Sequence, residues 1–185
     1  MKILKTKTIA FLILALLSLL SYNCKDKNSI KLNDIQVIGS HNSYKIQIEK
    51  PLWNYMFQQD SAGAISLQYH HIPLKEQLNL GLRNLELDIF HDPVGGRYSN
   101  PKGLEIVKQM GEVPLEYDNN KNLNKPGLKM FHVQDIDYRS HHLLFKDGLK
   151  EIKAWSDQNP NHTPIFILIN AKDGNTKGLT QPLPF

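Results

Sequence analysis

The sequence has few cysteines and no apolar run long enough to cross a membrane. Cys24 is the single cysteine in 185 residues, so no disulfide bond can form within the chain. The longest mainly apolar run, Ile9–Leu20, has 12 residues. A transmembrane helix needs about 18 or more. A chain of this length can form one domain of ordinary size without disulfide bonds.

The chain also lacks a basic cluster of the kind that binds nucleic acid. Its net charge is +4, but Lys2, Lys5 and Lys7 precede the apolar run, and no acidic residue precedes Cys24. Beyond residue 23, 19 basic and 18 acidic residues remain, a net charge of +1. No basic stretch interleaved with aromatic residues is left, so we expect no nucleic-acid partner.

The N-terminus has the form of an export signal. A cationic start, the apolar run and then small or polar residues are typical of a secretory signal peptide. A cysteine at the end of such a segment resembles a bacterial lipoprotein signal. We therefore predict a signal peptide over residues 1–23, a lipidated Cys24, a polar tether over residues 24–33, and an exported, membrane-anchored protein. Asn23 replaces the usual small residue, so a secreted protein without lipid is the alternative.

Two carboxylates two residues apart mark the centre of the sequence. In Gly81–Asp92 the residues alternate as in a strand, with Glu86 and Asp88 on one face and leucines on the other. Two acids on one face repel each other unless a cation lies between them. Calcium is a candidate, because it binds carboxylate and amide oxygens. The alternative is a half-exposed strand whose acids are solvated.

Three further segments are predicted to be strands. Asp34–Gly39 is rich in β-branched residues, and Leu128–Val133 follows a long irregular connection. That connection, from Asp92 to Gly127, indicates a functional or mobile loop. Pro164–Lys172 is a nearly uninterrupted apolar run, as in a parallel strand covered on both faces.

Two helices are predicted between these strands. Pro73 can begin one that ends at Gly81, and Leu144–Trp155 has an amphipathic pattern. Alternating strands and helices predict parallel βα units, whose chemistry gathers at the carboxyl ends of the strands. Three large aromatic residues are interpreted as core or helix-packing residues: Trp53, Phe145 and Trp155.

Each predicted strand carries polar residues at or near its carboxyl end. They are His41 and Asn42, Glu86 and Asp88, His132, and Asn170 and Lys172. Two imidazoles suit the cleavage of a phosphodiester, because one can remove a proton and the other can protonate the leaving oxygen, while a metal neutralises the phosphoryl oxygens. Five other histidines lie in segments predicted as loop, helix entry or strand end and receive no role: His70, His71, His91, His141 and His142.

Four short motifs, in this order, resemble the bacterial calcium-dependent phosphatidylinositol-specific phospholipase C family. They are Ser40–Tyr44, Gly81–Asp88, Asp92–Gly96 and Phe131–Asp137. The resemblance implies a (β/α)8 TIM-type barrel that cleaves phosphatidylinositol to diacylglycerol and cyclic inositol phosphate by attack of a substrate hydroxyl on phosphorus.

The same resemblance implies roles for individual residues. His41 and His132 would be the acid/base pair, and Glu86 is an alternative base. Asn42, Glu86 and Asp88 would bind calcium, with Asn170 as the fourth ligand.

The sequence departs from the family at the fourth calcium ligand, where related enzymes carry a glutamate. An amide at residue 170 lowers the formal ligand charge from three negatives to two, so we expect weaker calcium binding. Lys172 has two open interpretations: a contact to the substrate phosphate, or a solvated side chain beyond the strand.

The second departure is length. A barrel of this type needs roughly 250 residues, and only 162 follow the signal peptide. We therefore predict that residues 34–185 are the N-terminal half of a barrel, about four βα units, and the activity of this chain alone stays open.

Two rival functions remain. A glycerophosphodiester phosphodiesterase shares the Glu-x-Asp arrangement, but that family usually has His-Arg where this chain has His41-Asn42. A non-catalytic surface lipoprotein is favoured by the short length and by Asn170, and disfavoured by the retention of both His41 and His132.

Overall fold

The computed structural model describes residues 31–185. One compact unit ends at Gln36, and its described part contains a short 3-10 helix, η1 (Leu32–Asp34). The other unit comprises Val37–Phe185. The predicted signal peptide and Cys24 lie outside the described residues, as does most of the predicted tether. In the part of the chain that is described, no helix has both the length and the apolar character needed to cross a membrane.

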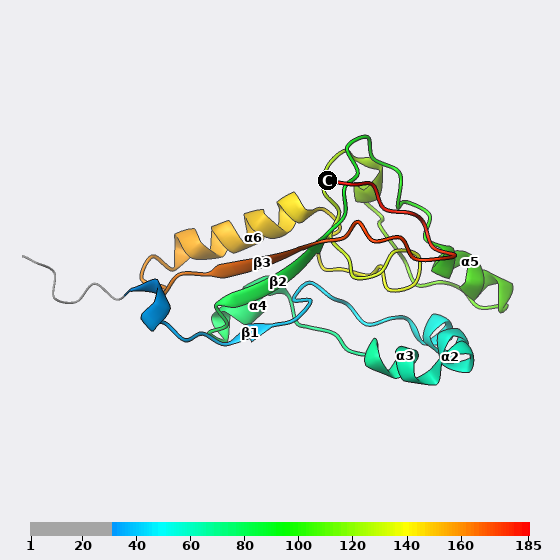
Figure 1. Ribbon diagram of the computed structural model, residues 1–185, viewed down its shortest axis with the longest axis horizontal. Helices are drawn as coiled ribbons and strands as arrows, with labels where there is room; N and C mark the ends of the chain where they lie inside the picture. Colours follow the sequence, from blue (N-terminus) through cyan, green and yellow to red (C-terminus); the bar gives the residue numbers. More distant parts are fainter. Residues whose placement is uncertain (1–30) are drawn as a thin grey trace, which may run out of the picture. The chain divides into compact units, whose positions relative to one another are not determined.

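The second unit contains a parallel sheet of three strands, in the order β1-β2-β3 (Figure 1). These are β1 (Gly39–Ser40), β2 (Asn84–Ile89) and β3 (Phe166–Ala171). The central strand β2 carries both acids of the Glu-x-Asp pair, and its Asp88 lies opposite Asn170 of β3. The predicted α/β class and the parallel pairing of the strands are therefore confirmed.

Helices occupy the connections between the strands. They are α2 (Lys50–Gln59), α3 (Ser61–Ser66), α4 (Leu74–Asn79), α5 (Lys102–Gln109) and α6 (Phe145–Gln158), with a short 3-10 helix, η2 (Asn122–Asn124). The two predicted helices correspond to α4 and α6. Gly81 follows α4 with a φ of +95°, a conformation that glycine adopts readily, so it stops the helix as predicted.

Helices α4 and α6 bury the apolar face of β2. Leu85 and Leu87 of the strand are fully buried in a cluster that contains Leu74 and Leu78 of α4 and Ile152 and Trp155 of α6. Figure 1 shows α6 running alongside β3. Because side chains alternate along a strand, Glu86 and Asp88 of β2 are directed away from these helices. The predicted alternation is confirmed, and it leaves the acids free for another role.

The first predicted strand is shorter than expected. Only Gly39 and Ser40 pair with β2, whereas Ile38 is 76 % exposed. β1 is short because β2 begins at Asn84, and Asn84 lies opposite Gly39. Residues that precede Gly39 therefore have no partner strand. Gly39 itself lies so close to β2 that a Cβ there would be 2.4 Å from the Asn84 carbonyl oxygen.

The prediction that Leu128–Val133 forms a strand is wrong. Lys129 forms isolated antiparallel bridges with Phe90 and Leu144, and Val133 forms one with Asp137. Because successive residues pair with different segments, no continuous ladder forms. The described residues therefore contain three paired strands in one sheet, not four, and do not form a closed barrel.

Two expectations about exposure and irregularity are also corrected. β3 lies at the edge of the sheet, with Leu168 and Ile169 about half exposed, so it is not covered on both faces. The connection from Asp92 to Gly127 is not irregular throughout, because it contains α5 and η2. Its Tyr98 and Leu123 are buried in a second apolar cluster with Phe131.

Candidate functional site

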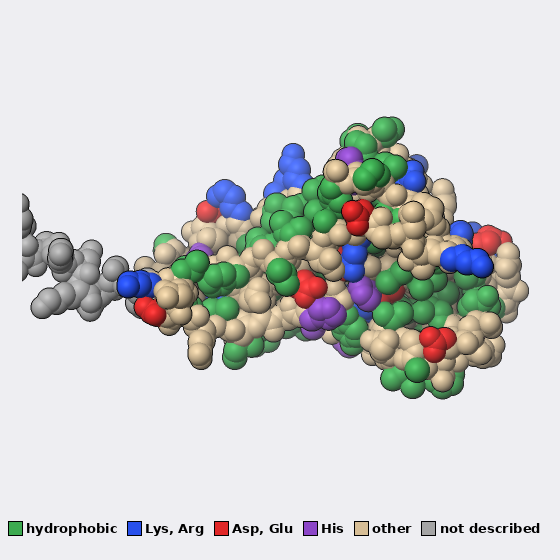
Figure 2. Space-filling view, in the orientation of Figure 1, with side chains coloured by type: hydrophobic (Ala, Val, Ile, Leu, Met, Phe, Trp, Pro, Cys, Tyr) green, Lys and Arg blue, Asp and Glu red, His purple; other side chains and the backbone are tan. Residues whose placement is uncertain are grey.

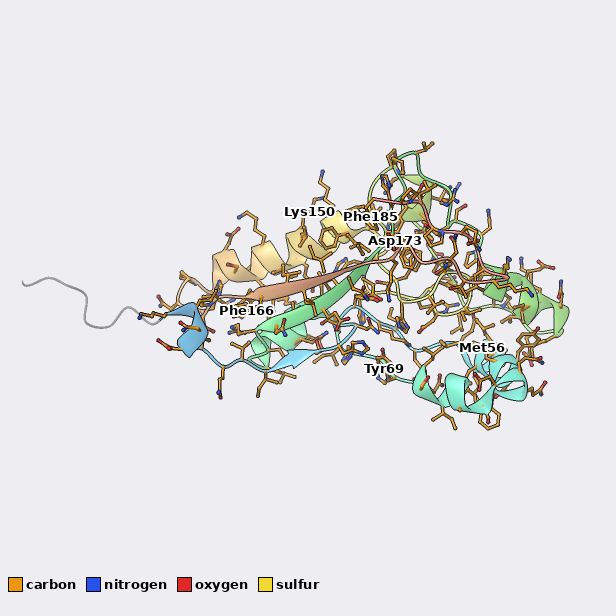
Figure 3. All side chains as sticks on the ribbon, in the orientation of Figure 1. Met56, Tyr69, Lys150, Phe166, Asp173 and Phe185 are labelled. Carbon is orange, nitrogen blue, oxygen red and sulfur yellow. The ribbon has the colours of Figure 1, made fainter. Side chains whose placement is uncertain are left out.

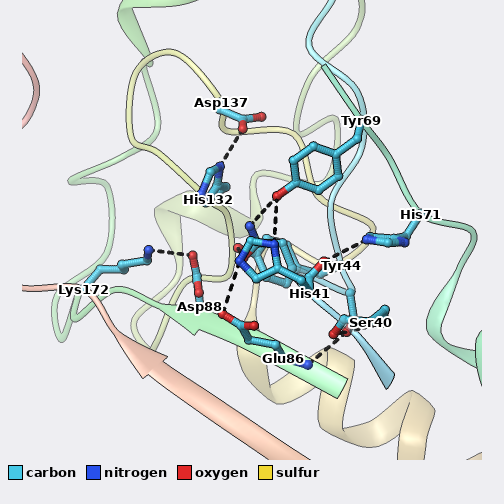
Figure 4. A network of polar contacts seen from close by, with 12 residues as sticks. Ser40, His41, Tyr44, Tyr69, His71, Glu86, Asp88, His132, Asp137 and Lys172 are labelled. Atoms are coloured by element: carbon cyan, nitrogen blue, oxygen red, sulfur yellow. Dashed lines mark hydrogen bonds and ion pairs between the residues drawn. The ribbon is translucent and has the colours of Figure 1, made fainter. Parts of the chain in front are cut away.

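The candidate site lies where the carboxyl ends of β1 and β2 meet. Figure 4 draws His41, Glu86, Asp88, His132 and Lys172 around this edge of the sheet. On the face drawn in Figure 2, histidine, acidic and basic side chains meet in one area. The parallel pairing of β1 with β2 places residues that follow Ser40 next to the acids of β2. This meeting of distant segments was predicted from the strand ends.

His132 is held by a buried ion-paired network. Its Nδ1 lies 2.7 Å from Asp137 Oδ2, and the other carboxylate oxygen lies 3.0 Å from Lys45 Nζ. The side chains of Lys45 and Asp137 are fully buried. Because an ionised carboxylate only accepts hydrogen bonds, His132 must donate Nδ1–H, which leaves Nε2 available for proton transfer.

Lys45 also fixes the neighbouring chain segment. Its ammonium donates to the carbonyl oxygens of Leu67 and Tyr69, each at 2.9 Å, and lies 4.6 Å from the centre of the Tyr69 ring. Burial lowers the pKa of Lys45, and the charge of Asp137 opposes that shift. In Figure 3, Tyr69 lies on the segment between α3 and α4, so Lys45 connects this segment to the site.

His41 is the exposed histidine of the site. Its side chain is 68 % exposed, and its Nε2 lies 3.7 Å from Glu86 Oε1. On the other side of the ring, Nδ1 lies 3.5 Å from the Tyr69 hydroxyl. Glu86 therefore lies where it can stabilise a protonated His41, while Tyr69 limits the orientation of the ring.

Asn42 is fixed by two tyrosines. Its Nδ2 donates to the Tyr69 hydroxyl at 2.6 Å, and its Oδ1 accepts from the Tyr44 hydroxyl at 3.2 Å. Burial and, second, the charge of Asp88 raise the pKa of Tyr44, so that hydroxyl remains a neutral donor. Asn42 has a φ of +51°, a left-handed conformation that asparagine tolerates better than most residues.

The loop after β1 is attached to β2 and supported by two further histidines. Ser43 N–H donates to the Glu86 carbonyl oxygen at 2.9 Å, and Ser43 Oγ accepts from the Glu86 N–H at 3.0 Å. His71 Nε2 donates to the His41 carbonyl oxygen at 2.8 Å, and His141 Nε2 donates to the His71 carbonyl oxygen at 2.7 Å. These contacts fix the backbone that carries His41 and Asn42.

Asp88 is fully buried beside β3. Neither of its carboxylate oxygens has a hydrogen-bond partner among the described residues. Lys172 Nζ lies 2.9 Å from Oδ2, so the contact is an ion pair. Lys172 is therefore not simply solvated beyond the strand.

The model of one protein family matches residues 30–185, and its description is phosphoinositide phospholipase C, Ca2+-dependent. The chain belongs to this family. The match covers the whole of the second unit, including every residue of the candidate site, so the predicted resemblance is confirmed. No curated protein and no solved structure matches the chain.

The donors at the site suit the calcium dependence of this phospholipase C family. Within residues 31–185, no group of three or more histidine, cysteine, aspartate or glutamate side chains forms a metal cluster. The predicted ligands are two carboxylates, Glu86 and Asp88, and two amides, Asn42 and Asn170. Because amides are not among these side-chain types, the predicted ligand set contains only two of them. The buried Asp88 carboxylate is the feature that fits a hard cation, because neither oxygen has a hydrogen-bond partner among the described residues and Oδ2 already lies beside the Lys172 ammonium. Asn170 lies opposite it in the register of β3.

Sequence reasoning missed three residues that shape the candidate site: Lys45, Tyr69 and Asp137. Asp137 lies in a motif that carried the family resemblance, five residues after His132, and that spacing is the signal that could have identified it. A buried lysine has no such signal, because lysines usually lie at the surface. His71 and His141 were predicted to have no role in the site, and their rings bind the backbone carbonyl oxygens of His41 and His71.

Proposed function

We propose that this protein is a calcium-dependent phosphodiesterase that cleaves phosphatidylinositol to diacylglycerol and a cyclic inositol phosphate. Family membership supports the reaction class. The observation that carries the proposal is the placement of two histidines with different partners beside a buried carboxylate: His132 with Asp137, and His41 with Glu86.

Proton transfer is assigned to the two histidines. In the reaction, an inositol hydroxyl attacks phosphorus and loses its proton, while the bond from phosphorus to the glycerol oxygen breaks and that oxygen gains a proton. One histidine accepts the first proton and the other donates the second. Asp137 orients His132 and stabilises its imidazolium form, as a carboxylate does in other acid/base pairs. Glu86 provides the corresponding charge for His41.

Calcium would be held by oxygens of Asn42, Glu86, Asp88 and Asn170. When bound, it would offset negative charge on the phosphoryl oxygens. Lys172 is the proposed contact for the same phosphate, since its ammonium already lies beside Asp88 at the rim of the sheet.

We also propose that the three parallel strands are part of a (β/α)8 barrel. Support comes from the helices between the strands and from the gathering of polar residues at the strand ends. Export and a lipid anchor at Cys24 remain proposals, supported by the sequence of the first 24 residues. Mass spectrometry of the membrane fraction, with Cys24→Ser as control, would detect the lipid.

The experiment that tests the proposed reaction is a rate measurement on phosphatidylinositol vesicles. We expect calcium-dependent hydrolysis that falls by about 100-fold or more in His41→Ala and in His132→Ala, the usual size of acid/base contributions. His70→Ala and His91→Ala are matched controls, because these residues lie outside the polar network, and they should retain the rate. Equal rates in His132→Ala and the unmodified chain would contradict the proposal.

A further inference from the structure

The Asp88 carboxylate already has a cation beside it. Asp88 is completely buried, and Lys172 Nζ lies 2.9 Å from Oδ2. No other basic side chain of residues 31–185 forms an ion pair with Asp88. An ionised carboxylate that is buried without a counter-charge is strongly disfavoured, so this ammonium stabilises the charged form of Asp88.

Lys172 is anchored at its backbone, whereas its side chain is long and partly exposed. Its N–H donates to the Ile89 carbonyl oxygen at 2.9 Å, which ties the residue to the end of β2 directly after β3. Its side chain is 29 % exposed and has a flexible four-carbon stem. Figure 4 shows it reaching Asp88 from the side opposite Glu86. The ammonium can therefore leave Asp88 without any change in the sheet.

We propose that Lys172 is an internal competitor of calcium: its ammonium occupies Asp88 in the metal-free protein and is displaced when calcium binds. This inference rests on the proposed function, because it takes Asp88 as a calcium ligand. Two cations cannot share one buried carboxylate at contact distance without repulsion. Since the ammonium is tethered, its effective concentration at Asp88 is in the millimolar range or above. Calcium must overcome that competition, which lowers its apparent affinity.

The competitor has a second consequence for the site. In the metal-free protein, the Lys172 ammonium provides a counter-charge for the buried Asp88 carboxylate. After displacement, the ammonium lies near the same rim and is free to contact a phosphate oxygen. One residue thus stabilises the empty site and becomes available to the substrate once the metal is bound.

Calcium titration without substrate tests this inference. Calcium binding would be measured by calorimetry on the full chain, on Lys172→Met and on Lys153→Met. Lys153 is a matched control, because it pairs with Asp157 on the exposed surface of α6. We expect Lys172→Met to bind calcium about tenfold more tightly and Lys153→Met to stay within twofold of the unmodified chain. Unchanged or weaker binding in a folded Lys172→Met would overturn the inference.

Two further variants keep the result interpretable. If Lys172→Met does not fold without calcium, Lys172→Arg is measured instead. A guanidinium holds a carboxylate through two hydrogen bonds, so we expect several-fold weaker calcium binding, and tighter binding would overturn the inference. Asp88→Asn separates the two proposals. If it binds calcium like the unmodified chain, the proposed metal site is wrong; if it abolishes binding while Lys172→Met changes nothing, only the competition is wrong.

Discussion

The buried network of Lys45, Asp137 and His132 allows a quantitative prediction. Asp137 Oδ1 contacts Lys45 Nζ at 3.0 Å and has no hydrogen-bond partner among the described residues. Asp137→Asn would leave the Lys45 ammonium buried without its anion. Removing one partner of a buried ion pair costs about 3–5 kcal/mol. Lys45 keeps two carbonyl acceptors, so we expect the lower end of this range, about 3 kcal/mol.

A double-mutant cycle isolates the pair. Lys45→Met alone should also destabilise the fold, because it leaves Asp137 with only His132. Lys45→Met combined with Asp137→Asn removes both charges, so its cost should be smaller than the sum of the single costs by about 2 kcal/mol. Free energies of unfolding would come from urea titration followed by the fluorescence of Trp53 and Trp155.

The exposed pair of Lys153 and Asp157 is the control for this cycle. Their side chains are 74 % and 62 % exposed, so the same cycle should give a coupling below about 0.5 kcal/mol. Single costs of Lys45→Met and Asp137→Asn that simply add would refute the reasoning, since they would show that the two buried charges do not stabilise each other.

Three further predictions concern other parts of the molecule. Gly103→Ala should lower the free energy of unfolding in urea by about 1–3 kcal/mol. The added Cβ would lie 2.6 Å from Leu52 Cδ2 and 2.8 Å from the Asp135 carbonyl oxygen. Gly174→Ala is the control and should leave the free energy of unfolding unchanged, because the space around Gly174 is open. Burial lowers the pKa of His71, so the unfolded chain binds its proton more readily and stability should fall below about pH 6.5; His71→Gln should flatten that decline in melting temperature. Asn170→Glu should tighten calcium binding in calorimetry, because it adds a third carboxylate, and unchanged affinity would exclude residue 170 as a ligand.

Local sequence patterns predicted the parts of the fold that depend on nearby residues. The alternation of residues 84–89 identified β2 and the two faces of the strand, and Gly81 marked the end of α4 through its left-handed conformation. The parallel pairing followed from the order of strands and helices. These predictions succeed because periodicity and helix stops act within one segment.

Pairing between distant segments was harder to predict. Leu128–Val133 has the composition of a strand, but its partners are Phe90 and Leu144 at isolated positions, which composition does not encode. β3 is as apolar as a covered strand, yet it lies at the sheet edge. In the site, the polar residues at the strand ends were found, whereas Lys45 was missed because its burial depends on Asp137, 92 positions away in the sequence.

The most direct measurement is the identity of the phosphorus product released from phosphatidylinositol vesicles, followed by 31P NMR with calcium or with a chelator. We expect a cyclic inositol phosphate that forms only with calcium and is absent in His132→Ala. A parallel sample contains glycerophosphoinositol, the deacylated substrate; glycerol phosphate formed there, with no cyclic product from the vesicles, would indicate the rival phosphodiesterase. No product from a folded, calcium-binding chain would contradict the proposed activity of this protein.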